Sequence, residues 1–119
     1  MAGLVEDAER DLPARRATLR RQLEQAHRLV EIARRAVELI EEGSTIFLGT
    51  GTTVEQMASM LPAFRLRIVT NSLSVFNLLE AREDCDLCLV GGMYRRRTAA
   101  FVGPTAEDAL RALAIDTAF

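Results

Sequence analysis

The chain has 119 residues and a formal net charge of −2, which fits one domain with a single hydrophobic core. Its composition, 49% apolar and 27% charged, is typical of a folded globular protein and excludes a disordered one. All 15 basic residues are arginine, which excludes any mechanism that needs a Schiff-base, catalytic or Walker-type lysine. The apolar runs are too short to span a bilayer, and the first ten residues lack the apolar segment of a secretory signal, so we expect a cytoplasmic protein with no membrane partner.

The amino-terminal third predicts one long helix from about Ala14 to Glu42. Apolar residues recur there at steps of three and four, and the stripe ends before Gly43, a residue type that commonly terminates helices. We expect Val30–Ile40 to cover a sheet and residues 14–28 to extend away from it. A short coiled coil through the same stripe stays open as an alternative. The stripe consists of Leu19, Leu23, Ala26, Val30, Ala33, Val37 and Ile40.

The rest of the chain alternates between strand and helix about every 20 residues. Such alternation requires right-handed crossovers and a parallel sheet, and the strands are nearly continuous apolar runs, as in sheets covered on both faces. We therefore predict an α/β fold with helices on both faces of a parallel sheet. The expected strands are 45–49, 66–70, 86–90 and 115–119, and the expected helices are 53–61, 72–81 and 105–113.

The last expected strand reaches Phe119 with no turn or cap after it. A sheet that stopped there would keep an open edge, so we expect a fragment of a longer protein that is incomplete at its carboxyl end. We divide the chain into a linker or extended helix, 1–29, and an α/β domain, 30–119.

The strongest local motif is Gly-Thr-Gly-Thr-Thr at 49–53, between the first strand and the next helix. Glycines let the backbone approach a ligand, and hydroxyls beside the free N–H groups of a helix start suit a phosphate. Thr52 and Glu55 also fit a capping box, with Thr53 as the other candidate cap, and an ordinary tight turn stays open. The motif is neither a P-loop, which needs lysine, nor a dinucleotide fingerprint, which needs a third glycine.

The other strand ends carry residues of a similar kind. Thr70-Asn71-Ser72 follows the second strand and Gly91-Gly92 follows the third, and the carboxyl ends of parallel strands share the edge where ligands bind. Arg95-Arg96-Arg97 follows in a loop, where we expect one or two guanidinium groups to reach a bound anion and the rest to be solvated. Asn71 also fits a helix cap, and Thr105 is the expected cap of the last helix.

Cys85 and Cys88 have the C-x-x-C spacing but lie across a strand, where residues three apart point to opposite faces. Zinc would need two more ligands, and the only histidine, His27, lies on the distant long helix. We expect buried structural thiols, no metal, no cofactor and no nucleophile–base set.

Four motifs resemble, in order and spacing, the carboxyl-terminal effector domain of the DeoR family of bacterial transcriptional regulators. They are IFLGTGTT at 46–53, VTNSL at 69–73, LVGGMYR at 89–95 and FVGP at 101–104, within a similarity that runs from about Ile32 to Phe119. The resemblance implies a Rossmann-like fold, similar to ribose-5-phosphate isomerase and the CoA transferases. It also implies a non-enzymatic sensor of a phosphorylated sugar or a related metabolite.

The resemblance implies effector contacts at the same strand ends. Family members usually carry Asp where this chain has Gly49, so a sugar-hydroxyl contact is missing or different here. The family's winged helix-turn-helix has no counterpart in these residues, so DNA would be bound only through a domain absent from this chain. The candidate effector- and phosphate-binding residues are Gly49, Thr50, Gly51, Thr52, Thr53, Thr70, Asn71, Ser72, Gly91, Gly92, Arg95 and Arg97.

Two other functions stay open. An isomerase-like enzyme of the same fold would use the same Gly-Thr-Gly-Thr-Thr turn, although the strand ends lack an evident carboxylate base. A dimerisation module with an idle pocket would use the stripe at Leu19 and Leu23. An exposed stripe and an open sheet edge favour a homo-oligomer in either case.

Overall fold

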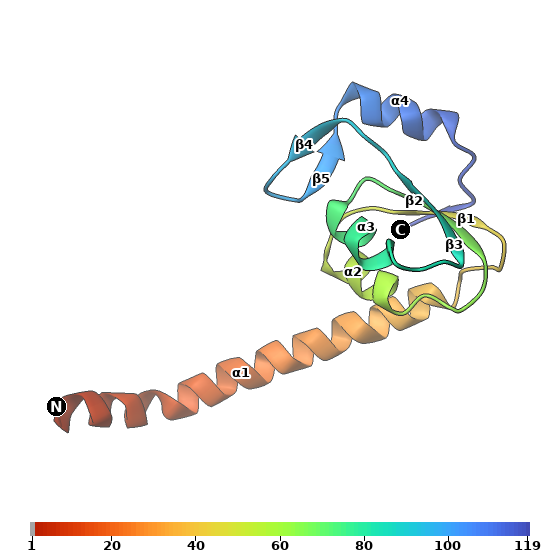
Figure 1. The fold of residues 1–119 in the computed structure, drawn as a ribbon. Coiled ribbons are helices and arrows are strands. Elements are labelled where there is room, and N and C mark those ends of the chain that lie inside the picture. The colour runs from red at the N-terminus through yellow and green to blue at the C-terminus, as the bar shows by residue number, and fades with distance from the viewer. Residues whose placement is uncertain (1) are drawn as a thin grey trace.

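The computed structural model describes the backbone of residues 2–119 and the side chains of residues 11–119. Its elements are α1 (Ala2–Val37), β1 (Thr45–Leu48), α2 (Thr52–Ser59), β2 (Leu66–Thr70), α3 (Leu73–Leu79), β3 (Cys85–Leu89), β4 (Met93–Arg95), β5 (Ala100–Val102), α4 (Pro104–Ala112) and β6 (Thr117–Ala118). A parallel sheet of order β3-β2-β1-β6 lies between helices, and β4 and β5 form a separate antiparallel hairpin (Figure 1). The predicted α/β class with a parallel sheet is confirmed.

The parallel sheet brings three strand ends to one edge. β1 pairs with β2 on one side and with β6 on the other, and β2 pairs with β3. A helix connects β1 to β2 and another connects β2 to β3, so the chain returns to the same starting edge each time. The carboxyl ends of β1, β2 and β3 therefore lie together, and we call this side the carboxyl edge.

The main core fills the space between one face of the sheet and helices α1, α2 and α3. Only the last turns of α1, residues 29–37, take part: Ala33 is fully buried, whereas residues 11–28 are exposed and the helix projects from the body (Figure 1). The expectation that residues 14–28 extend away is confirmed, whereas the last turns of α1, expected to cover the sheet, pack mainly on α2. The buried members of this core are Ala33, Ile40, Ile46, Leu48, Val54, Met57, Ala58, Leu66, Ile68, Val75 and Leu79.

The opposite face of the sheet is covered by α4, where Val69, Val90 and Ala106 are buried together. Helix α4 does not cover all of β3. Cys88 is exposed on this face of the strand, whereas Cys85 packs against the main core on the other face. Both thiols are free. The prediction that they point to opposite faces is confirmed, but the prediction that both are buried is wrong. None of the helices in the described part of the chain is long and apolar enough to cross a membrane.

Helix α1 differs from the prediction at both ends. It begins at Ala2, well before Ala14, so Pro13 lies inside the helix, where it lacks the N–H for the usual hydrogen bond and its ring crowds the preceding turn. It ends at Val37 rather than Glu42. Tighter backbone turns follow and bring Ile40, which is 7% exposed, into the core.

The starts of the three shorter helices also differ from the prediction. At α3 the hydroxyl of Ser72 accepts a hydrogen bond from the Val75 N–H, so Ser72 rather than its neighbour caps the helix. At α2 and α4 the cap is a glycine with positive φ, a conformation that threonine disfavours. The N-cap residues are thus Gly51, Ser72 and Gly103, in place of Thr52 or Thr53, Asn71 and Thr105.

The arginine-bearing segment predicted as a loop forms the β4–β5 hairpin. Its register pairs Met93 with Val102, Tyr94 with Phe101 and Arg95 with Ala100. The rings of Tyr94 and Phe101 pack at 5.3 Å between centroids, which supports this short ladder. The hairpin therefore places Arg96 and Arg97 at its tip instead of in an open loop.

Candidate functional site

The turn from β1 to α2 forms the first wall of the candidate site. Gly51 caps α2 with φ 124° and ψ 160° and offers no side-chain hydrogen bond. The first hydrogen bond within the helix runs from the Glu55 N–H to the Gly51 carbonyl, at 3.0 Å. The N–H groups of Thr52 and Thr53 precede this bond and have no carbonyl to bind within the helix. Uncovered donors at a helix start favour an anion.

The β4–β5 hairpin forms the second wall, and the junction between β2 and α3 holds it. The Leu73 N–H donates to the Ala99 carbonyl and the Phe101 N–H donates to the Asn71 carbonyl, both at 2.8 Å. The side-chain Nδ2 of Asn71 donates to the Phe101 carbonyl at 3.2 Å. These bonds join segments about 30 residues apart, and they fix the hairpin tip opposite the β1–α2 turn.

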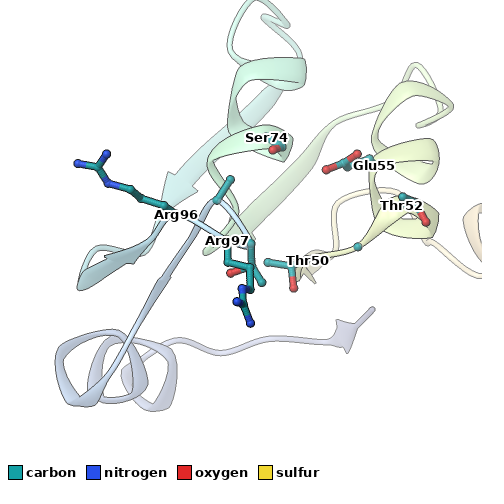
Figure 2. Close-up of a pocket in the computed structure, with 9 residues that line it drawn as sticks. Thr50, Thr52, Glu55, Ser74, Arg96 and Arg97 are labelled. Carbon is teal, nitrogen blue, oxygen red and sulfur yellow. The ribbon is translucent and has the colours of Figure 1, made fainter.

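Between these walls lies a pocket of about 340 Å³. Figure 2 shows the side chain of Arg97 directed toward Thr50, whereas that of Arg96 extends away from the other lining residues. On the opposite side, the carboxylate of Glu55 is directed toward Ser74 at the start of α3 (Figure 2). The lining residues are Thr50, Gly51, Thr52, Glu55, Ser74, Arg96, Arg97, Thr98 and Ala99.

The structure brings four of the predicted site residues into this pocket, namely Thr50, Gly51, Thr52 and Arg97. The Thr52 side chain turns outward from α2, so this residue borders the pocket mainly at the helix start (Figure 2).

The polar side chains that follow β2 serve the fold. Thr70 and Ser72 are buried, and the Thr70 hydroxyl donates to the Leu48 carbonyl at 2.6 Å and accepts from the Ser72 N–H at 3.0 Å. Asn71 holds the hairpin, as described above, while its Oδ1 is buried without a hydrogen-bond partner in the described chain. The structure thus places this segment behind the pocket, where it supports the hairpin.

The remaining predicted residues lie outside the lining. The N–H of Gly49 donates to the Phe119 carbonyl at 3.0 Å, which assigns this glycine to the ladder with the β6 segment. Gly91 and Gly92 precede β4 at the base of the hairpin, and Arg95 is exposed on β4. The Thr53 side chain is half-buried in the first turn of α2 and outside the lining, so this residue would contribute only its backbone N–H at the helix start.

Five lining residues were not among the predicted site residues: Glu55, Ser74, Arg96, Thr98 and Ala99. Glu55 was predicted as half of a capping box, but with Gly51 as the cap it is the fourth helical residue and cannot close such a box. Its spacing of three from Thr52 is the one signal that could have placed it beside the turn. Ser74, Arg96, Thr98 and Ala99 line the pocket because the β4–β5 hairpin packs at the start of α3.

The charged side chains of the pocket have no oppositely charged partner among the described residues. Among the described side chains, Glu55, Arg96 and Arg97 form no ion pair, whereas Arg34, Arg82 and Arg111 each pair with a carboxylate elsewhere. An unpaired guanidinium beside free backbone N–H groups is suited to binding an anion. The pocket can therefore bind a ligand that carries both an anionic group and hydrogen-bond donors.

The perturbed titratable groups lie elsewhere. Arg82 binds Asp84 through a hydrogen bond of 2.9 Å from Nη2 to Oδ2, and this hydrogen bonding holds the pKa of the Asp84 carboxyl below its usual range. Burial raises the pKa of the Cys85 thiol, which disfavours a reactive thiolate. Among the described residues, no group of three or more His, Cys, Asp or Glu side chains is placed to hold a metal ion. Arg82, Asp84 and Cys85 are not among the residues that line the pocket.

Comparison with known proteins identifies the family of this chain. Residues 24–119 match the family described as DeoR C terminal sensor domain. Relatives named lactose phosphotransferase system repressor occur in Lactococcus lactis subsp. lactis, 45% identical over 93 residues, and in Streptococcus mutans serotype c, 45% identical over 85 residues. The matches cover 76% and 70% of this chain but 36% and 33% of those proteins, so the chain spans about a third of their length. The chain thus belongs to the DeoR family of regulators, and the match is to the family's carboxyl-terminal sensor domain.

Proposed function

We propose that the pocket at the carboxyl edge binds a phosphorylated sugar, with the phosphate held by the start of α2 and by Arg97. The observation that carries this proposal is the placement of uncovered N–H groups, the Thr50 hydroxyl and an unpaired guanidinium around one pocket. Each of these groups donates hydrogen bonds, and together they match the acceptor oxygens of a phosphate.

The glycine cap of α2 supports phosphate binding at this helix start. A serine cap uses its side chain to occupy a helical N–H, as Ser72 does for Val75 in α3. Gly51 has no side chain, so the corresponding N–H groups of α2 stay accessible to a ligand. Its φ of 124° is also one that favours glycine.

The sugar part of the proposal draws on the relatives. Their name ties them to a lactose phosphotransferase system, and we carry over the ligand class of a phosphorylated carbohydrate. The size of the pocket, about 340 Å³, is in the range of small-molecule sites. An acidic residue in the lining, Glu55, adds the hydrogen-bond acceptor that sugar hydroxyls need.

In the whole regulator, we expect the sensor domain to act in the cytoplasm without catalysis. The bound sugar phosphate would shift the domain between two states and change DNA binding by a separate helix-turn-helix domain. We assign residues 1–29 to the linker and 30–119 to the effector-sensing unit. The exposed part of the α1 stripe, at Leu19 and Leu23, would form a homo-oligomer.

A thermal-unfolding screen tests the ligand class. Glucose 6-phosphate, galactose 6-phosphate, fructose 6-phosphate and ribose 5-phosphate are compared with the free sugars and with inorganic phosphate. A ligand at 100 times its Kd stabilises the folded state by about 2.7 kcal/mol, a readable rise in Tm. We expect at least one sugar phosphate to raise Tm more than its free sugar does. Equal shifts for both, or turnover of an aldose phosphate into its ketose, would contradict a phosphate-reading sensor.

A further inference from the structure

The pocket has a second end that the phosphate does not explain. Figure 2 shows the Glu55 carboxylate on α2 directed toward Ser74 on α3, on the side of the pocket away from Arg97. Within the described chain, neither the carboxylate of Glu55 nor the hydroxyl of Ser74 makes a hydrogen bond. Both groups are half-buried, so they have lost part of their hydration without gaining a protein partner.

Glu55 invites a simpler explanation, in which an acidic residue in the first turn only stabilises the helix start. Glu107 provides the comparison. It is the fourth residue of α4, which also begins after a glycine cap, and its N–H binds the Gly103 carbonyl at 3.0 Å, as that of Glu55 binds Gly51. Glu107 is exposed and lies outside the pocket lining. Both glutamates therefore place a negative charge near a helix start, but only Glu55 also lines a pocket.

A carboxylate in this position also limits what can bind. It accepts hydrogen bonds from hydroxyl groups, which are donors, and it repels a second anionic group at that end of the pocket. Arg97 lies on the opposite side, so the charge of the pocket runs from positive to negative across it. A ligand with one phosphate and several hydroxyls fits this polarity, and a ligand with phosphates at both ends does not.

We propose that Glu55 and Ser74 form the hydroxyl-binding end of the pocket and determine its preference for sugar monophosphates over bisphosphates. Glu55 accepts hydrogen bonds from sugar hydroxyls, and Ser74 donates to or accepts from a neighbouring hydroxyl. This inference rests on the proposed function, since it needs the phosphate at the α2 start and Arg97.

Calorimetric titration of the 119-residue chain tests it. The unchanged chain is compared with three variants: Glu55→Gln, Ser74→Ala and the control Glu107→Gln. The probes are inorganic phosphate, fructose 1,6-bisphosphate and the four sugar monophosphates of the screen. Glutamine keeps the size of the side chain and removes its charge, so Glu55→Gln should weaken the best sugar monophosphate about tenfold. Inorganic phosphate should not weaken, and the preference for monophosphate over fructose 1,6-bisphosphate should fall by at least the same factor.

The controls separate recognition from folding. Glu107→Gln should leave all affinities unchanged, while its Tm should shift as much as that of Glu55→Gln, because both lose the same charge at a helix start. Ser74→Ala, which keeps the charge, should weaken the monophosphate severalfold and leave inorganic phosphate unchanged. It provides an independent test if Glu55→Gln folds poorly.

Two outcomes would overturn the inference. The first would leave the sugar-sensing proposal intact, and the second would overturn that proposal as well. If the unchanged chain binds a sugar monophosphate and Glu55→Gln keeps the same ratios among all probes, the hydroxyl-binding end is wrong and the sensor proposal stands. If no sugar phosphate binds the unchanged chain more tightly than inorganic phosphate does, the sugar-sensing proposal itself is wrong and this inference fails with it.

Discussion

Helices α2 and α4 begin in nearly the same way. Each follows a glycine cap of positive φ, 124° at Gly51 and 99° at Gly103, and each carries a glutamate as its fourth residue. The difference lies in what stands opposite. The tip of the β4–β5 hairpin, with Arg97, faces α2, whereas Met93 at the base of that hairpin lies near Gly103. A glycine cap uncovers backbone donors, but the second wall and its charge are what make the candidate site.

The largest expected effect comes from disturbing that second wall. A Cβ added at Gly92 would lie 2.7 Å from the Val102 carbonyl oxygen, on the partner strand of the hairpin. Gly92→Ala should cost about 2 kcal/mol of stability or more, because the hairpin must shift, and should weaken sugar phosphates strongly. Urea unfolding and calorimetric titration measure the two effects. At neighbouring Gly91 an added Cβ meets nothing within 4 Å, so Gly91→Ala should do much less, and equal effects would refute the role given to the hairpin.

Arg97 at the hairpin tip is the charge that faces the start of α2 and has no counterpart at α4, so its removal should weaken anion binding. A hydrogen bond to a charged group contributes about 1.5–3 kcal/mol, so Arg97→Gln should weaken inorganic phosphate and sugar phosphates about 10- to 100-fold. Arg111→Gln serves as the control, since Arg111 pairs with exposed Asp108 on α4. A sugar phosphate that binds Arg97→Gln and the unchanged chain alike would show that the guanidinium takes no part.

Substituting the two glycine caps tests both starts at once. Alanine at either position must adopt a positive φ with an extended ψ, a region almost restricted to glycine, which costs about 1–3 kcal/mol, so Gly51→Ala and Gly103→Ala should lose similar amounts of unfolding free energy. The space is not limiting, because an added Cβ meets nothing within 4 Å at Gly51 and only Met93 Cγ at 3.9 Å at Gly103. Only Gly51→Ala should also weaken phosphate ligands. If both substitutions weaken them equally, the binding site is not at α2.

The smallest expected effect is a change in Tm on removing the Arg82–Asp84 ion pair, which lies outside the pocket. The pKa of Asp84 is lowered in the folded state by Arg82, so the pair contributes stability above the ordinary aspartate pKa of about 3.9 and loses it as pH falls through the lowered value. Asp84→Asn should therefore lower Tm slightly at pH 7 and leave it unchanged near pH 2. The matched exposed pair at Asp108 should give a smaller difference with Asp108→Asn. A Tm difference that grows toward low pH would have the wrong sign for this account.

Much of the fold could be predicted, because its signals are local. The strand expected at 66–70 coincides with β2, and the strands expected at 45–49 and 86–90 differ from β1 and β3 by one residue at their ends. Continuous apolar runs between helices define such strands whatever their neighbours do. The β4–β5 hairpin has no such signal. Its strands are three residues long, and bonds to Asn71 and Leu73 hold them.

The candidate site also has one part that the sequence predicts and another that only the tertiary structure reveals. The Gly-Thr-Gly-Thr-Thr turn is visible in the sequence, because glycines between a strand and a helix have a local meaning. Ser74 and Ala99 have none, since they line the pocket only through the hairpin and its junction with α3. Thr70 and Ser72 looked like ligand residues, yet their hydroxyls are used inside the protein. Whether a polar side chain faces a ligand or the core depends on the tertiary arrangement.

The most direct test follows the backbone amides by nuclear magnetic resonance during a titration with the best sugar phosphate of the screen. The N–H groups of Thr52 and Thr53 are the proposed phosphate donors, and Thr105 occupies the matching position at the start of α4. We predict that the amide signals of Thr52 and Thr53 and the side-chain Nε signal of Arg97 move together with one Kd, while that of Thr105 stays in place. Saturable binding that moves Thr105 or other distant amides and leaves Thr52 and Thr53 unchanged would contradict the account.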